Sequence, residues 1–198
     1  VKIEQAKNMQ IVNCWVCELP NSIELIGGEN IVVKNCQLGA QPTGITCKVQ
    51  EVNKLSFINN QVYPDGRENL VLDACNNCVI EGNNFKSYYN GILVLNGNDN
   101  TVNKNIFWLT GAVQNQLLDH GDDFGIINVK GNNNMVTSNS LSCEWAYAGA
   151  VTVNAVQGTG NVFKNCFVDN LESYRVFLVN AQTEVSNCVS SDKVSIVE

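Results

Sequence analysis

The chain has 198 residues, of which 44% are hydrophobic, and it carries a net charge of −7 with only 12 Lys and Arg. This length and apolar content are enough for one sizeable domain with its own core. The acidic balance and the lack of a basic cluster exclude binding to nucleic acid or to a membrane surface, and no apolar run approaches the ~18 residues that cross a bilayer, so we expect a neutral partner.

An internal repeat runs through the chain, and each unit is marked by an Asn after an apolar segment. The recurring residues, spaced 22, 24, 24, 22, 34, 26 and 22 apart, are Asn13, Asn35, Asn59, Asn83, Asn105, Asn139, Asn165 and Asn187. This period is typical of one coil of a parallel β-helix, whereas helical repeats of about 33 residues or more do not fit it. We therefore expect an all-β fold, a right-handed parallel β-helix (solenoid) of about eight coils. The Asn side chains form a hydrogen-bonded ladder at one corner.

A second strand is expected about ten residues before each Asn. In chain order these strands are Ser22–Ile26, Gly44–Lys48, Asn69–Asp73, Gly91–Leu95, Gly125–Val129, Gly149–Val153 and Arg175–Val179. Aligning the last four on their first residue predicts an apolar outward stripe of Ile92, Val94, Ile126, Ala150, Val176 and Leu178. Parallel sheets are apolar on both faces when both are covered. The stripe therefore predicts a homo-oligomer, a trimer about the solenoid axis.

The nine cysteines are an odd number, so they cannot all pair within the chain. Two Cys-x-x-Cys motifs, which begin at Cys14 and Cys75, have the spacing of half a zinc site each. However, Cys14, Cys36, Cys166 and Cys188 each follow a ladder Asn, which favours small buried core residues. We expect buried, reduced thiols, with no metal, no cofactor and no disulfide framework, because a core of this size needs no cross-links.

Two coils contain insertions that project from the same edge, and long loops on a rigid scaffold commonly carry sites. These insertions are residues 109–123 and 142–147. The candidate catalytic residues are Asp119, His120, Asp122 and Asp123. The candidate substrate-binding residues, from the same and neighbouring coils, are Asp65, Tyr88, Tyr89, Trp145, Tyr147, Glu172 and Arg175.

The carboxylates at this edge have a spacing that suits glycosidic chemistry. Asp122 and Asp123 align between aromatic residues of adjacent coils, with Asp65 and Glu172 two coils away. Coils stack ~4.8 Å apart, so these carboxylates lie roughly 10 Å from the Asp pair, near the ~6.5–9.5 Å of inverting glycosidases. Aromatic rings beside carboxylates suit a glycan. The alternatives are turn chemistry for Gly-Asp-Asp and a solvated loop position for His120, the single His.

The segment Gly121–Gly131, which contains Asp122-Asp123-Phe, resembles the Asp-Asp strand of polygalacturonase-type glycoside hydrolases. The resemblance implies acid and base roles for these two residues. The rest of that signature is absent, since Tyr88-Tyr89-Asn90 and Ala148-Gly149-Ala150 replace Asn-Thr-Asp and Gly-His-Gly, although Arg175 matches an Arg of that family. As a whole, the Asn-rich chain is similar to the inulin fructotransferase group and to phage tailspike domains, which are trimeric β-helices with glycan sites between or along subunits.

These features predict one β-helix domain over residues 1–198, a segment of a longer chain or assembly. The predicted function is a carbohydrate-active β-helix that cleaves or transfers glycosides of a largely neutral poly- or oligosaccharide. The alternative is a non-catalytic structural or glycan-adhesive module of a trimeric fibre or surface protein. An enzyme predicts a pocket with at least two carboxylates and an aromatic ring, and a spacer predicts a flat edge. We expect an extracellular or surface location, although no export signal is visible.

Overall fold

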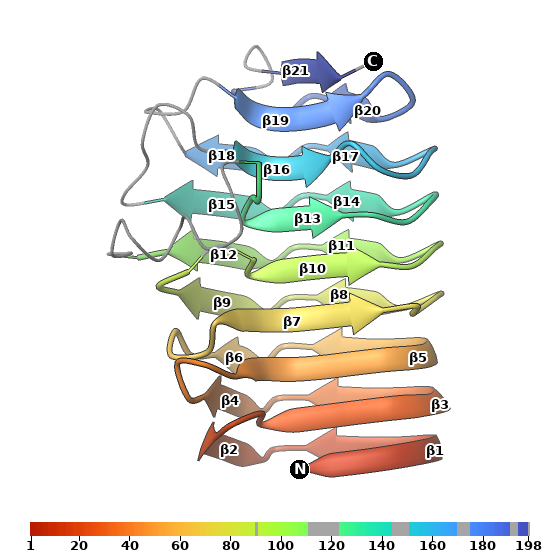
Figure 1. The fold of residues 1–198 in the computed structure, drawn as a ribbon, viewed down its shortest axis with the longest axis vertical. Coiled ribbons are helices and arrows are strands. Elements are labelled where there is room, and N and C mark those ends of the chain that lie inside the picture. Colours follow the sequence, from red (N-terminus) through yellow and green to blue (C-terminus); the bar gives the residue numbers. More distant parts are fainter. Residues whose placement is uncertain (90, 111–122, 144–150, 170–174, 191–193, 198) are drawn as a thin grey trace.

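The computed structural model describes residues 1–89, 91–110, 123–143, 151–169, 175–190 and 194–197. In these residues the fold is a parallel β-helix of seven complete coils, which confirms the all-β solenoid and comes close to the expected eight. The coils stack along one axis, from β1 at one end to β21 at the other (Figure 1). Within the described part of the chain, no helix is long and apolar enough to cross a membrane.

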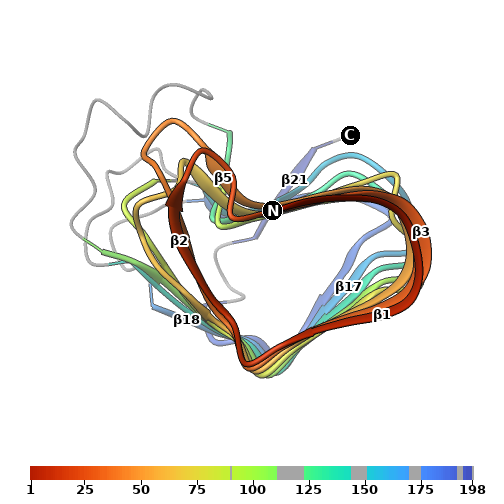
Figure 2. The ribbon, with the colours of Figure 1, turned by 90° about the horizontal axis from the view of Figure 1, so that it is seen from below.

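The larger sheet has 14 strands and covers two of the three sides of each coil, as the view along the axis shows (Figure 2). In the first three coils one long strand bends round the corner between these sides: β1 (Lys2–Val12), β3 (Ile23–Lys34) and β5 (Ile45–Ile58). Later coils divide this path into two. The first side then holds β7 (Glu68–Asp73), β10 (Leu93–Asn96), β13 (Ile127–Val129), β16 (Val151–Ala155), β19 (Arg175–Asn180) and β21 (Val194–Val197). The second holds β8 (Val79–Glu81), β11 (Thr101–Asn103), β14 (Met135–Thr137), β17 (Val162–Lys164) and β20 (Glu184–Ser186).

The third side is a separate seven-stranded sheet. Its strands, one from each coil, are β2 (Trp15–Leu19), β4 (Gln37–Ala40), β6 (Gln61–Val62), β9 (Asn84–Ser87), β12 (Ile106–Leu109), β15 (Ser140–Cys143) and β18 (Phe167–Asp169). Alternate residues of each strand point into the core, where like side chains stack coil upon coil. Phe85 and Phe107, for example, are fully buried with parallel rings whose centroids are 5.0 Å apart. The other face of the sheet is therefore turned toward solvent, and the packed core supports it rigidly.

An Asn ladder holds the corner between the second and third sides. Asn60, Asn83, Asn105 and Asn139 are buried there at equivalent positions. The backbone N–H and the Nδ2 of Asn83 both donate to Oδ1 of Asn105, at 2.9 Å each. The same pair of bonds joins Asn60 to Asn83 and Asn105 to Asn139. Each coil is therefore linked to the next through buried amides, which satisfy one another as buried polar groups must.

The membership of this ladder differs from the predicted column of eight Asn. The other five predicted members occupy the preceding corner position, where φ lies between 51° and 58°: Asn13, Asn35, Asn59, Asn165 and Asn187. Asn tolerates this left-handed backbone conformation. In four of those coils the interior position is taken by the next residue, Cys14, Cys36, Cys166 or Cys188. The sequence analysis merged two neighbouring columns of residues into one, because the residues of both columns recur with nearly the same spacing.

A second Asn ladder, which the sequence analysis did not identify, lies at the corner between the first two sides. Asn100 donates from its backbone N–H and Nδ2 to Oδ1 of Asn134, at 3.1 and 3.0 Å, and Asn134 repeats both bonds to Asn161. Cys78 begins this column, since its N–H donates to Oδ1 of Asn100 at 2.8 Å. Two corners of the coil are thus fixed by the same chemistry.

The predicted apolar stripe is largely buried, and Val94 is the one of its described members that is half-buried. Ile92, Ile126, Val176 and Leu178 retain 0%, 2%, 0% and 5% of their accessible surface within the single chain. The strand register also differs by two residues from the predicted alignment, because Val151 pairs with Arg175. Ala150 lies outside the described residues. The chain covers these side chains itself, so the homotrimer stays a prediction without this support.

Three of the four thiols that were expected in the core are buried, and the fourth, Cys14, is half-buried against it. Cys36, Cys166 and Cys188 are buried, and none of them is in a disulfide. Cys166 and Cys188 lie in consecutive coils, where the N–H of Cys166 donates to the Sγ of Cys188 at 3.4 Å. A sulfur atom here takes the acceptor role that an Asn oxygen has in the middle of the ladder. These cysteines are therefore ladder members rather than cross-links.

Candidate functional site

The outer face of the seven-stranded sheet carries two columns of side chains, because alternate residues of each strand point the same way. The first column, in coil order, contains Trp15, Gln37, Gln61, Asn84 and Ile106. The second contains Cys17, Gly39, Tyr63, Lys86 and Trp108. Aromatic rings and amides therefore dominate this face over the first five coils.

The larger cavity on this face, the N-terminal cavity, has a volume of about 550 Å³. It is lined by Trp15, Cys17, Glu18, Gly39, Ala40, Gln41, Pro42, Tyr63 and Asp65. Gly39 gives the cavity its depth. A Cβ at that position would lie 3.3 Å from Cβ of Tyr63 and 3.4 Å from Sγ of Cys17. Any larger residue would therefore fill the floor between these two side chains.

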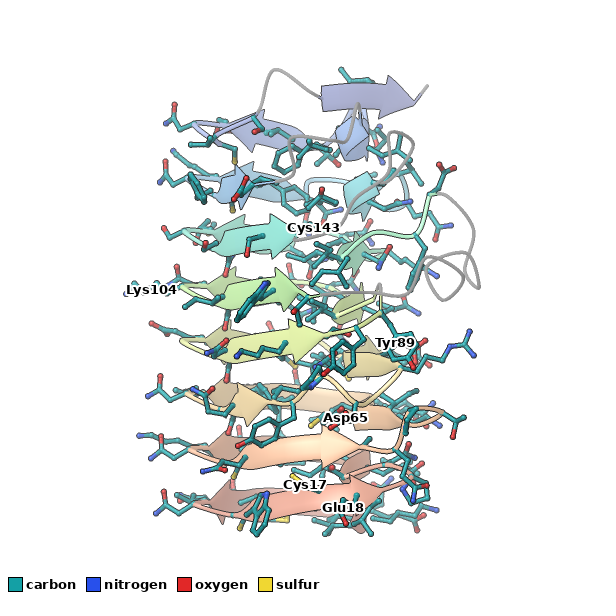
Figure 3. All side chains as sticks on the ribbon, turned by 90° about the vertical axis from the view of Figure 1, so that its left-hand side faces the viewer. Cys17, Glu18, Asp65, Tyr89, Lys104 and Cys143 are labelled. Atoms are coloured by element: carbon teal, nitrogen blue, oxygen red, sulfur yellow. The ribbon has the colours of Figure 1, made fainter. Side chains whose placement is uncertain are left out.

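Two carboxylates and a thiol line the N-terminal cavity: those of Glu18, Asp65 and Cys17. Figure 3 shows Cys17, Glu18 and Asp65 on the same side of the solenoid, over its lowest coils. Partial burial is the main cause that raises the pKa of Cys17, and the negative charges of Glu18 and Asp65 raise it further, against a hydrogen bond with Trp15. Cys17 is therefore a neutral thiol at pH 7 rather than a nucleophile. The groups of this cavity that suit acid–base chemistry are its two carboxyls.

A second hollow, the central cavity, lies next to the first along the axis and has a volume of about 360 Å³. Its lining residues are Gln61, Val62, Tyr63, Pro64, Asn84, Lys86, Tyr88, Trp108 and Thr110. Lys86 places its Nζ 4.5 Å from the ring centroid of Trp108, a cation–π contact. Tyr63 lines both cavities, and its hydroxyl donates to Oε1 of Gln37 at 2.8 Å, which fixes the ring between them.

The structure brings only some of the predicted site residues to these cavities. Asp65 lines the N-terminal cavity and Tyr88 lines the central cavity. Tyr89, the next residue in the chain, is half-buried. Asp123 is exposed and lines a different hollow of about 190 Å³, formed with Phe124 and strands β13 and β16. Arg175 is described only by its backbone, which lies in β19. The other predicted residues lie outside the described part of the chain: Asp119, His120, Asp122, Trp145, Tyr147 and Glu172.

Sequence reasoning missed Trp15, Glu18, Tyr63, Lys86 and Trp108. A signal for four of them was present, since outward-facing residues alternate with an apolar residue that packs toward the core in Trp15-Val-Cys, Gln61-Val-Tyr63, Asn84-Phe-Lys86 and Ile106-Phe-Trp108. That alternation is typical of a half-exposed strand. The third strand of the coil was not assigned, so these residues had no common face in the sequence analysis.

The sequence model of one family, described as periplasmic copper-binding protein (NosD), matches residues 2–187. Solved structures of DFA-IIIase from Arthrobacter chlorophenolicus A6 are also similar. The structure without its lid has a TM-score of 0.83 at 23% identity, the complex with GF2 0.81 at 22%, and the C387A mutant with DFA-III 0.80 at 21%. Each match covers 100% of this chain, which spans about half of the DFA-IIIase chain (52–54%). No curated protein matches. At this identity the likeness shows the fold alone.

Copper, which that family description names, prefers thiolate, thioether and imidazole ligands. In the part of the chain that the structure describes, no three His, Cys, Asp or Glu side chains gather in a way that could hold a metal ion. Cys75 and Cys78 lie in the core, where burial raises their pKa values to about 11 and about 12. The other motif is divided, since Cys14 faces the ladder and Cys17 the cavity. The described residues do not fit a copper site.

Proposed function

This chain belongs to the NosD family of right-handed β-helix proteins, and we propose that it is a carbohydrate-active member that acts on a largely neutral poly- or oligosaccharide. The observation that carries the proposal is the N-terminal cavity, in which Glu18 and Asp65 share about 550 Å³ with the rings of Trp15 and Tyr63. This combination of two carboxylates and aromatic side chains is what the enzyme hypothesis requires of a pocket. Structures of the same fold that contain GF2 and DFA-III support it.

The chemistry of the cavity suits sugars. Aromatic rings offer apolar faces against which the C–H faces of a sugar pack, and carboxylates accept hydrogen bonds from its hydroxyls. The volume falls within the ~300–1,000 Å³ of small-molecule sites, which combine apolar walls with a few polar groups. The net charge of −7 favours a neutral glycan over an anionic one.

In the reaction that we propose, one carboxyl group of the Glu18–Asp65 pair donates a proton to the glycosidic oxygen as the bond from that oxygen to the anomeric carbon breaks. The other carboxylate takes a proton from a water molecule, or from a sugar hydroxyl in a transfer reaction. The oxygen that loses this proton bonds to the anomeric carbon. Each carboxyl thus changes its protonation state once, and no outside reagent is needed. Asp122, with Asp123 and Asp119 near it in the sequence, is the second proposed catalytic centre.

The test is turnover of neutral oligosaccharides by the whole chain, with products separated by chromatography. We expect Glu18→Gln and Asp65→Asn each to lower turnover by about 100-fold or more, because general acid–base catalysis contributes on the order of 10²–10⁴-fold. Glu51→Gln is the matched control. It neutralises an exposed carboxylate at a corner with φ 55°, a backbone conformation that Gln5 also adopts.

Three outcomes separate the proposals. Loss of turnover in Glu18→Gln and Asp65→Asn, but not in Glu51→Gln, supports the N-terminal cavity. Loss only in Asp122→Asn moves catalysis to the insertion in residues 109–123. Binding of glycans without turnover by the unaltered chain favours the alternative, a glycan-adhesive module. The central cavity suits that alternative, since the described residues that line it include rings and amides but no carboxylate. A trimeric, extracellular protein of greater length remains our proposal for the context of this domain.

A further inference from the structure

We infer that the two cavities form one continuous track that binds an extended, neutral oligosaccharide lying along the solenoid axis, from β2 to β12. This inference rests on the proposed function and names its substrate class, a linear glycan of several sugar units rather than a single sugar. The cavities are adjacent because Tyr63 lines both of them. A ligand that fills one cavity therefore passes the same ring to enter the other.

The spacing of the aromatic rings indicates an extended ligand. Trp15 lies in the first coil, Tyr63 in the third and Trp108 in the fifth, all on the seven-stranded sheet. With coils ~4.8 Å apart, the backbone positions that carry successive rings are about 10 Å apart along the axis, and those of Trp15 and Trp108 are about 19 Å apart. A single sugar ring does not span the distance from Trp15 to Trp108. A chain of sugars that runs parallel to the axis can contact all three.

The polar groups between the rings are those that hydroxyls require. Gln37, Gln61 and Asn84 form one column beside the aromatic residues, and their amides both donate and accept hydrogen bonds. The Oδ1 of Asn84 is buried and has no hydrogen-bond partner among the described residues. A buried acceptor of this kind favours a ligand that brings a donor. A sugar hydroxyl supplies one once the carboxamide turns toward the central cavity that Asn84 lines.

The charges along the track select a neutral chain. The residues that line the two cavities include two carboxylates, Glu18 and Asp65, and one cation, Lys86. The ammonium of Lys86 lies over the ring of Trp108 and is thus already engaged. A polyanionic glycan would meet the two carboxylates, and the described lining residues offer no second cation to offset them, so like-charge repulsion opposes its binding. Trp15, which is 77% exposed, lies at the β2 end of the track.

The experiment measures affinity against ligand length. The full chain is titrated with linear fructo-, xylo- and cello-oligosaccharides from one to six units, with calorimetry and Trp fluorescence as readouts. We expect affinity to rise with length in at least one series. Trp108→Ala should weaken the binding of the longest oligomer by about fivefold to tenfold, because one ring contact is lost. The affinity for the shortest oligomer that binds should stay unchanged. Trp108→Phe keeps a ring and should restore most of the affinity.

Met135→Ala is the control for a general effect on folding. It removes an apolar side chain that is 50% exposed, in β14 on another side of the coil. Affinity that does not depend on length, or an equal loss for short and long ligands in Trp108→Ala, would overturn the track and leave the proposed function standing. If none of the oligosaccharides binds, the track and the proposed function both fail.

Discussion

Replacing Asn105 by Ala should be among the most destabilising single changes in this chain. The Oδ1 of Asn105 accepts two hydrogen bonds from Asn83, and its Nδ2 donates to the carbonyl of Ile80 and to Oδ1 of Asn139, at 2.9 and 3.0 Å. Ala leaves the buried N–H of Asn83 without an acceptor and the carbonyl of Ile80 without this donor. A buried polar group left without a partner costs about 1–3 kcal/mol. We expect a total loss of about 3–5 kcal/mol, a large part of the ~5–15 kcal/mol that stabilises a domain.

The measurement is urea unfolding followed by far-UV circular dichroism, with the free energy of unfolding compared between variants. Asn165→Ala is the matched control. It changes an exposed corner Asn with φ 55°, and the left-handed conformation costs Ala only about 1–2 kcal/mol. Asn105→Cys should lose less stability than Asn105→Ala, because sulfur is an acceptor in the same column at Cys188. Equal losses in Asn105→Ala and Asn165→Ala would refute the division of the Asn residues into two columns.

Two further predictions follow from the cavity floor and from the buried thiols. Gly39→Ala should weaken oligosaccharide binding at the N-terminal cavity while leaving the unfolding midpoint nearly unchanged, since its Cβ enters the space between Cys17 and Tyr63. Undiminished affinity in a calorimetric titration would exclude that floor from the site. Burial raises the pKa of Cys75 from 9.0 to about 11. The contribution of this buried, protonated thiol to the stability of the fold is therefore complete below pH 9 and is lost as the pH rises through 9 to 11. The unfolding free energy should fall over that range, and Cys75→Ala should flatten the fall. An unaltered slope would contradict this account.

The sequence was sufficient for the fold because the solenoid repeats its chemistry in every coil. An Asn that recurs at each corner and an apolar strand before it identify a parallel β-helix without any long-range information. The same regularity produced the error in the ladder. Asn59 and Asn60 are neighbours, and only the backbone geometry shows that the first forms the corner while the second faces the core. A period fixes how far apart equivalent residues are, but it does not fix which neighbour points inward.

The candidate site was less predictable because it is built from residues of different coils on the least regular strand. β6 contains only Gln61 and Val62, and the pairing of β2 with β4 shifts register between Val16 and Leu19. Short, irregular strands give a weak periodic signal. Trp15, Tyr63 and Trp108 are brought to one face only by stacking. The prediction of an exposed apolar stripe was wrong for a related reason. The chain's own fold, rather than a partner, covers Ile92 and Ile126.

The geometry of the Asn ladder at the corners of the solenoid does not depend on the length of the loops between successive ladder residues. Asn105 and Asn139 are 34 residues apart and Asn83 and Asn105 are 22 apart, yet the linking bonds measure 2.9 and 3.0 Å in the first pair and 2.9 Å in the second. The longer spacing therefore leaves the ladder unchanged, and in the sequence the additional residues fall between β12 and β13, at the edge where the third side of the coil meets the first. That edge can accept foreign loop sequences, by engineering or by evolution, without moving the aromatic face that β2 to β12 present beside it.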